Sequence, residues 1–329
     1  MSDLHRAVGD YLAMRRGLGF SLVREGRWLM DFAGYLEQAG SAHVTTELAV
    51  SWATRTRADV NPAWWNHRLA VVRVFARYMS TLDPATEIPP AELMPCRYRR
   101  VAPYLFTPGQ IDALIGAAAA LTHPLRALNY TTLIALLAVT GMRVGEACGL
   151  DRSDVDAGIG VVTIRAGKLA KAREVPLHPT ASQALLAYGR RRDQLCPAAR
   201  TPAFFVNARG SRLASRRVPE IFAQLCRAAG IGAVPGGRNP RVHDLRHSFT
   251  VATMLDWYRA GLDVHARLPL LSTYLGHVDP ISTYWYLQAA PELLALAAQR
   301  LEHPVPTTAH GALSWPRSHR FWKRSSPII

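Results

Sequence analysis

The sequence predicts a mainly α-helical protein with one small β-hairpin, divided into two domains. The 329 residues exceed the usual size of one domain, and 49% of them are hydrophobic, which is enough for a substantial core. Over most of the chain, apolar residues recur at spacings of three and four, as they do on one face of a helix. Only 160–177 contains strand-like segments, so the second domain is expected to be α+β with few strands.

Residues 1–82 are expected to form a helical N-terminal domain. Segment 62–79 shows the helical spacing, and Arg68, Arg73 and Arg77 lie within it. An apolar face can pack there while the guanidiniums bind phosphates, but a charged face in contact with water would give the same pattern. The sequence leaves both interpretations open.

Residues 83–104 are expected to be an extended linker. They contain five prolines and the basic cluster Arg97, Arg99 and Arg100, and they show little periodicity. The second domain is therefore placed at 105–302.

This second domain is expected to open with a helix, because Thr107 is a good N-cap and Pro108 suits the first helical position. Another helix should end just before Gly141, which interrupts the pattern, and a short helix should cover 144–150. Further helices are expected over 180–193, 216–229, 243–260, 266–275, 280–288 and 291–302.

A β-hairpin is expected between the first and second groups of helices. Segments 160–164 and 174–177 are strand-like, and the connection between them holds Lys168 and Lys171. Only three of the 39 basic residues are lysines, so two in one short segment indicate a need for an amine there.

Positive charge dominates the chain and points to a polyanionic partner. Lys and Arg outnumber Asp and Glu by 39 to 24, which gives +15 and favours nucleic acid. Basic and acidic residues number 13 and 10 in 1–100, 22 and 14 in 101–302, and 4 and 0 in 303–329. The last segment is expected to be a basic tail that orders only on binding.

Other classes of protein are disfavoured. Cysteines are widely spaced and form no CxxC pair, so neither a zinc site nor disulfides are predicted. No apolar run reaches the roughly 18 residues that a membrane span needs, and the N-terminal residues lack a signal-peptide pattern. We expect a cytoplasmic protein with reduced thiols, no cofactor and no membrane partner.

Five short segments stand out when they are read together. They are TGMRVGE at 140–146, Gly167-Lys168, HDLRH at 243–247, LGH at 275–277 and STYWY at 282–286. Each alone is a weak signal, because an arginine after a glycine turn is usually structural and a single tyrosine usually packs in a core. Their order and spacing change that judgement.

In this order the segments resemble the catalytic domain of the tyrosine recombinases, the phage-integrase family that includes related transposases. The resemblance covers 105–302 and implies an integrase-type catalytic domain. It also implies that 1–82 is a core-binding domain that clamps DNA. The family's six catalytic positions fall on Arg143, Lys168, His243, Arg246, His277 and Tyr286.

The chemistry suits these residue types. Two planar guanidiniums can neutralise the charge that develops on the nonbridging phosphate oxygens. A phenol, with a reference pKa of about 10, is a better leaving group than an aliphatic alcohol, so a phosphotyrosine at Tyr286 stays reversible. An amine such as Lys168 can protonate the departing 5′-oxygen.

Two positions have a neighbouring competitor. Lys171 shares the hairpin connection with Lys168, and only the family's Gly-Lys pattern favours Lys168. Tyr284 lies near Tyr286, but at about 100° per residue the two point roughly 200° apart on a helix, so both cannot reach one phosphate. Tyr286 has the family's spacing of nine residues after His277.

Other roles remain open at this stage. Either His243 or His277 can take the proton of the nucleophile, while the other binds a phosphate oxygen. Glu146 and Asp244 can orient the neighbouring arginines, or they can serve as helix caps or surface residues.

The expected function is a site-specific DNA recombinase that works through a 3′-phosphotyrosine. The resemblance implies a homotetramer, or a tetramer with related recombinases, on double-stranded DNA at specific sites. The protein is expected to be associated with the nucleoid. Segment 274–294 resembles the integrases of transposon-like elements more than the enzymes that resolve chromosome dimers. The alternatives are a catalytically silent DNA-binding accessory protein of the same fold and a type IB topoisomerase.

Overall fold

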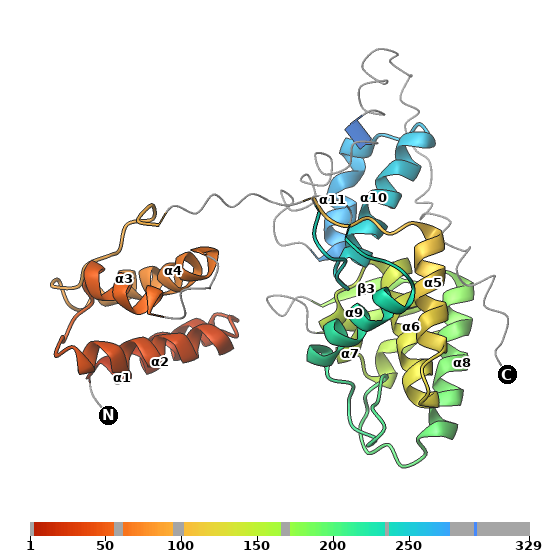
Figure 1. Cartoon of the computed structure of the whole chain (residues 1–329), viewed down its shortest axis with the longest axis horizontal. Helices are drawn as coiled ribbons and strands as arrows, with labels where there is room; N and C mark the ends of the chain where they lie inside the picture. The colour runs from red at the N-terminus through yellow and green to blue at the C-terminus, as the bar shows by residue number, and fades with distance from the viewer. Residues whose placement is uncertain are drawn as a thin grey trace. The chain divides into compact units, whose positions relative to one another are not determined.

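The computed structural model describes residues 3–55, 62–94, 102–165, 172–233, 237–276 and 293–294. It divides the chain into two compact units, Met1–Arg100 and Val101–Ile329 (Figure 1). In the described parts, the regular secondary structure consists of helices and one three-stranded antiparallel sheet, so the predicted mainly α class is confirmed. The helix expected at 280–288, most of the one expected at 291–302, and the tail lie outside the described residues.

The first unit is built of helices around one apolar core. Its described helices are α1 (Asp3–Gly17), α2 (Val23–Gln38), α3 (Thr46–Thr54) and α4 (Pro62–Met79). Helix α4 packs against the other three. Phe32, Trp52 and Leu69 are fully buried there, because the apolar stripe of each helix turns inward.

Two arginines of α4 serve the fold of this unit. Arg68 is only 4% exposed, and its guanidinium carbon lies 3.9 Å from the ring centroid of Trp52. Both interpretations considered for Arg68, a phosphate contact and a hydrated face, are therefore wrong: its apolar stem and flat head pack inside the unit. Arg73 donates to the carbonyls of Pro89 and Pro90, at 2.6 Å each, and so ties the following segment to α4.

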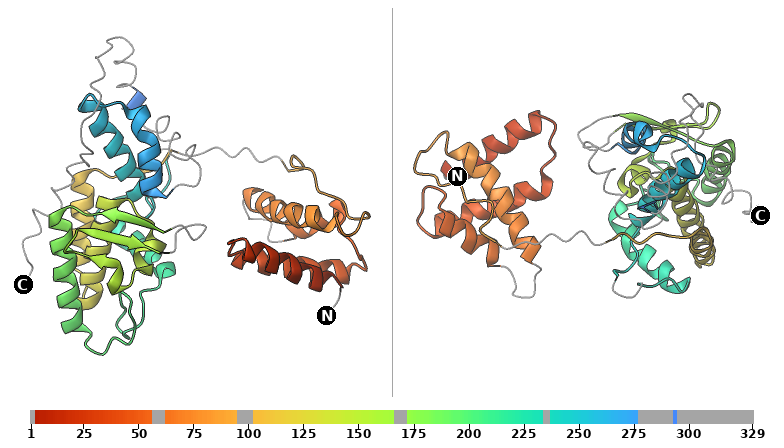
Figure 2. Two further views of the ribbon diagram at one scale, coloured as in Figure 1. Left: turned by 180° about the vertical axis from the view of Figure 1, so that it is seen from behind. Right: turned by 90° about the horizontal axis from the view of Figure 1, so that it is seen from above.

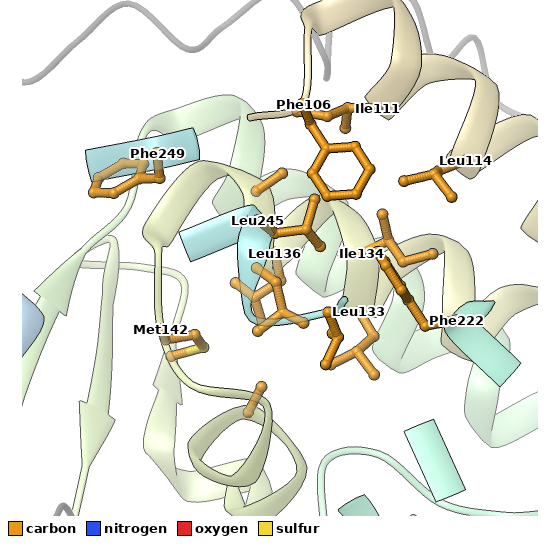
Figure 3. Packing of buried hydrophobic residues seen from close by; sticks show 14 of the residues in the cluster. Phe106, Ile111, Leu114, Leu133, Ile134, Leu136, Met142, Phe222, Leu245 and Phe249 are labelled. Atoms are coloured by element: carbon orange, nitrogen blue, oxygen red, sulfur yellow. The ribbon is translucent and has the colours of Figure 1, made fainter. Parts of the chain in front are cut away.

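The second unit is organised around one buried helix. Its helices are α5 (Pro108–Ala119), α6 (Pro124–Thr140), α7 (Val144–Gly149), α8 (Pro179–Leu195), α9 (Val218–Ala228), α10 (Asp244–Arg259) and α11 (Val264–Leu275). Helix α6 packs against α5, α8 and α10, which explains why every residue of its segment 133–139 is apolar. Figure 3 shows side chains from α5, α6, α9 and α10 converging with Phe106, which precedes α5. The labelled helix residues are Ile111, Leu114, Leu133, Ile134, Leu136, Phe222, Leu245 and Phe249.

The start of α5 confirms the predicted cap. The Thr107 hydroxyl accepts a hydrogen bond from the Gln110 N–H at 3.2 Å, and the Gln110 side chain accepts one from the Thr107 N–H at 3.0 Å. Two N–H groups that have no partner within the helix are thereby satisfied.

The sheet of the second unit contains the predicted hairpin and one further strand (Figure 2). Its strands are β1 (Val155–Asp156), β2 (Val161–Ile164) and β3 (Arg173–Pro176), all antiparallel in that order. Val162 pairs with Val175, and both are buried. The register places Arg173 opposite Ile164, at the end of β3 that packs against α11.

In the parts of the chain that the structure describes, no helix is both long enough and apolar enough to cross a membrane.

Candidate active site

The candidate site is built at the carboxyl end of α11. This helix ends at Leu275, and Gly276 continues the chain in the left-handed conformation with φ 65° and ψ 44°. The last carbonyls of a helix have no N–H partner within it, and they carry the negative end of the helix dipole. Cationic donors are therefore favoured at this end.

Three arginines supply those donors to three consecutive carbonyls. Arg173 donates to Tyr274 at 2.9 Å, Arg246 to Leu275 at 2.7 Å, and Arg143 to Gly276 at 3.0 Å. The three come from β3, from the first turn of α10 and from the residue before α7. One helix end thus gathers segments that lie up to 133 residues apart in sequence.

Arg143 stands at the N-cap of α7 and faces partly outward. Its N–H donates to Glu146 Oε2 at 2.9 Å, and its Nη1 donates to Glu146 Oε1 at 2.7 Å. The Arg143 side chain is 27% exposed, whereas that of Glu146 is 5% exposed. Glu146 therefore orients the Arg143 side chain and also caps α7, so both the orienting role and the capping role considered from the sequence are confirmed, whereas a surface position is wrong.

Arg246 is fully enclosed and joins two helix ends. It donates to Gly141 O at 2.8 Å and to Leu275 O at 2.7 Å, which are at the ends of α6 and α11. Gly141 has φ +61°, and a Cβ there would lie 2.5 Å from Phe249 Cδ1. Only glycine fits this turn, which explains the Thr-Gly pair in front of the first motif arginine.

His243 immediately precedes α10 and lies within the field of both motif arginines. Burial, followed by the positive charges of Arg246 and Arg143, lowers the pKa of His243 to about 4. The ring of His247 stands edge-on to it, with centroids 4.8 Å apart and planes at 89°. Burial and the charge of His243 lower the pKa of His247 to about 3. Both rings are therefore neutral near pH 7.

Asp244 is completely buried, so its interpretation as a surface residue is wrong. Its carboxylate accepts hydrogen bonds from Arg238 Nη2 at 2.6 Å and from the Arg241 N–H at 2.7 Å. It fixes the approach of the chain to α10 and so helps to place His243.

Arg173 was not identified from the sequence. It binds both oxygens of Glu146, through Nη1 at 3.1 Å and Nη2 at 2.7 Å. The available signal was its position at the start of the second strand of the hairpin, two residues after Lys171. Nothing local shows that its partners come from α7 and α11.

The structure brings together Arg143, His243 and Arg246 of the six expected catalytic residues. Lys168, His277 and Tyr286 lie outside the described residues, as does the competitor Lys171. Within the described ranges, no group of three or more His, Cys, Asp or Glu side chains is arranged to hold a metal ion.

Comparison with known proteins decides the family. The model of the phage integrase family matches residues 105–292, which is more than half of the chain. The chain belongs to the phage integrase family. This confirms the family predicted from the five motifs, and with it the enzyme class: a site-specific tyrosine recombinase, which breaks and rejoins DNA strands.

Individual members of the phage integrase family match over nearly the whole chain. The integrase/recombinase y4rB of Sinorhizobium fredii is 44% identical over 310 residues, covering 92% of this chain and 98% of the relative. The tyrosine recombinase XerC of Mycobacterium tuberculosis is 31% identical over 307 residues, covering 90% of this chain and 96% of the relative. The solved structure of the Tn1549 transposon integrase with transposon right end DNA has the same fold as this chain, with a TM-score of 0.65 at 16% identity. The match covers 92% of this chain and 99% of the integrase chain.

Proposed function

We propose that this recombinase cuts DNA through a 3′-phosphotyrosine at Tyr286 and rejoins it by reversing that step. The Tyr286 phenol oxygen attacks the scissile phosphorus, the bond from phosphorus to the 5′-oxygen breaks, and the 5′-oxygen takes up a proton. A phenolate leaves more readily than an aliphatic alkoxide, so the phosphotyrosine keeps the energy of the broken phosphodiester bond available for rejoining. The assigned side chains supply the charge and the protons, and the proposal includes no metal or cofactor.

Arg143 and Arg246 are proposed to bind the nonbridging oxygens. The observation that carries this role is their convergence: one donates to the carbonyl of Gly276 and the other to that of Leu275. Two guanidiniums on adjacent carbonyls form a concentrated positive site on a rigid helix end, which suits a phosphate whose charge grows in the transition state.

The histidines are proposed to complete the same site. His277 follows Gly276 directly, so its backbone nitrogen is bonded to the carbonyl carbon whose oxygen Arg143 holds. We assign it to a phosphate oxygen. We assign the proton of Tyr286 to His243, whose imidazole is neutral near pH 7. The negative charge of the bound phosphate would offset the charges of Arg246 and Arg143, which lower the pKa of His243.

Lys168 is proposed to protonate the departing 5′-oxygen, with Lys171 as the competing candidate. An alkoxide leaves poorly unless it gains a proton during bond breaking. An ammonium group supplies that proton and also adds positive charge to the phosphate site.

Four copies of the chain are proposed to act together on two DNA duplexes. Complete exchange breaks four strands, and each chain offers one Tyr286. We further propose that residues 1–82 clamp the duplex and that 83–104 link the two domains. The protein is proposed to act at specific sites on nucleoid DNA in the cytoplasm and to move a transposon-like element.

A nicked suicide duplex tests the proposal. Duplexes made from the DNA that flanks the gene, with a strand break three nucleotides beyond the candidate scissile phosphate, release a short 5′-hydroxyl fragment on cleavage and trap the protein. We expect a covalent band that survives detergent, together with four-way junction products on intact sites. Tyr286→Phe should lose the band and keep DNA binding, whereas Tyr284→Phe should keep both.

The other readouts separate the alternative functions. DNA binding without a band from the unaltered protein would leave an accessory role. Relaxation of any supercoiled plasmid without junctions would indicate a topoisomerase. Peptide mapping that places the DNA on Tyr284 would overturn the assignment of the nucleophile.

A further inference from the structure

Arg173 is an enclosed arginine at the first position of β3. Its side chain is 12% exposed. All three guanidinium nitrogens donate: Nε to Tyr274 O at 2.9 Å, Nη1 to Glu146 Oε1 at 3.1 Å and Nη2 to Glu146 Oε2 at 2.7 Å. It therefore joins the end of α11 to the carboxylate that orients Arg143.

Glu146 is shared between the two arginines. Its Oε1 accepts from Arg143 Nη1 and Arg173 Nη1, and its Oε2 accepts from the Arg143 N–H and Arg173 Nη2. Burial alone raises the pKa of Glu146, but the hydrogen bonds and charges of Arg173 and Arg143 outweigh burial and lower it to about 2. The carboxylate is therefore ionised near neutral pH.

The charge balance of this cluster depends on Arg173. Two guanidiniums and one carboxylate leave one net positive charge next to the candidate phosphate site. Without Arg173, Arg143 and Glu146 would form a neutral pair, and the carboxylate would be free to take both donor edges of Arg143. Arg143 would then be both turned toward Glu146 and weakened as a partner for phosphate.

The turn at Gly276 is fitted to the Arg173 guanidinium. A Cβ on Gly276 would lie 2.7 Å from Arg173 Nη1 and 2.9 Å from its Cζ. Gly276 itself adopts φ +65°, a conformation that side chains disfavour. The backbone that carries the carbonyl bound by Arg143 thus rests directly on the Arg173 head group.

We propose that Arg173 is a positioning residue for DNA cleavage: through Glu146 it directs the guanidinium of Arg143, and through the Tyr274 carbonyl it holds the helix end on which Arg143 and Arg246 meet. This inference rests on the proposed role of Arg143 at the scissile phosphate. It adds a residue that touches neither DNA nor the reacting atoms.

The test compares two chemical forms of the scissile phosphate in the suicide duplex. A methylphosphonate replaces one charged nonbridging oxygen with a neutral methyl group, so it removes the charge that Arg143 is proposed to neutralise. Arg173→Ala should slow single-turnover cleavage of the phosphate about 10- to 100-fold, by analogy with the loss of a residue that orients a metal ligand. On the methylphosphonate the loss should shrink to roughly 3-fold or less, since the missing charge needs no partner.

Arg212→Ala is the matched control. Arg212 makes the same kind of contacts at the other end of α7, donating to Gly149 O at 2.7 Å, to Leu150 O at 3.0 Å and to the Asp151 carboxylate. Its removal should lower the melting temperature but change cleavage of both substrates by the same factor. A double variant, Arg143→Ala with Arg173→Ala, should slow cleavage of the phosphate much less than the product of the two single losses, because the part of the Arg173 effect that passes through Arg143 is already lost.

Three outcomes would overturn the inference. Equal slowing on phosphate and methylphosphonate would make Arg173 a stability residue only. Unchanged cleavage of the phosphate would remove it from the reaction. The cleavage rate of Arg173→Ala could instead recover on a duplex with a sulfur at the 5′-bridging position and not on the methylphosphonate. Arg173 would then act through the hairpin connection that holds Lys168 and Lys171, and not through Arg143.

A conservative variant covers the case in which Arg173→Ala does not fold. Arg173→Lys keeps the charge but loses the planar fork, so it should show a smaller loss that the methylphosphonate also relieves. The proposed function has a separate outcome. If the unaltered protein forms no covalent adduct, the proposed function is wrong. If the unaltered protein forms the adduct and the Arg173 variants cleave at the same rate, only the inference about Arg173 is wrong.

Discussion

Arg143 and Arg246 hold adjacent carbonyls but differ in freedom. Arg246 is 1% exposed and is fixed by two helix ends, whereas the Arg143 side chain is 27% exposed and is held chiefly by Glu146. A buried donor that bridges two helices cannot turn without disturbing both. Of the two arginines proposed to bind the scissile phosphate, we therefore infer that Arg246 is the fixed one and that Arg143 is the one whose orientation neighbouring residues can change.

At the same scale, the two neutral histidines predict how stability varies with pH. The folded pKa values of His243 and His247, about 4 and about 3, lie below the usual value of 6.5. Between pH 6.5 and 4 these two histidines bind more protons in the unfolded chain than in the folded chain. Their contribution to the free energy of unfolding should therefore be complete well above pH 6.5 and be lost as the pH drops toward 4. Urea unfolding at pH 7.5, 6.0 and 5.0 measures this.

The control for the histidine prediction is a double variant, His243→Asn with His247→Asn. It should be less stable at pH 7.5 but lose less stability between pH 7.5 and 5.0. Identical slopes for the two proteins would show that neither histidine is held neutral by the fold.

The leaving-group acid can be identified by changing one atom of the substrate. Lys168→Ala should slow cleavage of ordinary DNA by about 100-fold or more, the usual contribution of general acid catalysis. It should slow cleavage of a duplex with a 5′-bridging sulfur far less, because a thiolate departs without a proton. Lys171→Ala serves as the comparison. If Lys171→Ala shows the sulfur-dependent recovery and Lys168→Ala does not, the roles of the two lysines must be exchanged.

At the scale of elements, the turn after α6 gives the sharpest prediction. Gly141→Ala would force φ +61° on a residue with a Cβ, which costs about 1–2 kcal/mol, and would drive that Cβ to 2.5 Å from Phe249 Cδ1. Because Arg246 binds the carbonyl of Gly141, cleavage should fall along with stability. Chemical denaturation and the suicide duplex measure both.

A second glycine provides the opposite expectation. Gly189 lies inside α8, and a Cβ there would meet nothing within 4 Å. Gly189→Ala should therefore stabilise the protein by about 0.5–1 kcal/mol and leave cleavage unchanged. A loss of stability at Gly189, or none at Gly141, would contradict the argument from backbone geometry.

Local signals predicted many of the elements. The cap at Thr107 and the break at Gly141 act through neighbouring residues, so the sequence contains them directly. Strand β1 was missed because its two residues are too few to show alternation. Helix α11 begins two residues earlier than expected, because the Asp263 side chain caps it by accepting from the Ala266 N–H.

The candidate site was predictable only where a motif marks it. Arg143 and Arg246 each sit in a motif, and the order of the motifs implied that they meet. Arg173 has partners 27 and 101 residues away, in Glu146 and Tyr274, and a single sequence does not reveal such pairings. Arg192 illustrates the same limit, since it appears in a run of exposed charges yet is 2% exposed and donates to main-chain carbonyls.

At the scale of the whole molecule, the charge is unevenly divided. Subtracting acidic from basic residues gives 13 − 10 = +3 for 1–100, 22 − 14 = +8 for 101–302 and 4 − 0 = +4 for 303–329. The last two segments therefore hold 12 of the 15 net charges. If phosphate contacts follow this distribution, the second unit and the tail provide most of the electrostatic affinity for DNA.

Salt dependence of DNA binding tests that division. Each phosphate that a protein neutralises contributes about −0.9 to the slope of log affinity against log salt concentration. Removing 303–329 takes away four basic residues and no acidic one, so the slope should become shallower by up to about 3.6, or 4 × 0.9. Fluorescence anisotropy with a labelled duplex at several salt concentrations measures the slope.

A full-length variant separates the charge of the tail from its length. In it, Arg317, Arg320, Lys323 and Arg324 are changed to glutamine. If the tail acts through charge, this variant and the truncated protein should show the same shallower slope, because both release fewer counterions on binding. Both should also melt close to the unaltered protein, since solvated charges contribute little to folding stability. If the truncated protein melts at a far lower temperature and the glutamine variant does not, the tail is part of the folded structure. If the salt slope is unchanged in both, the DNA contacts lie elsewhere in the protein.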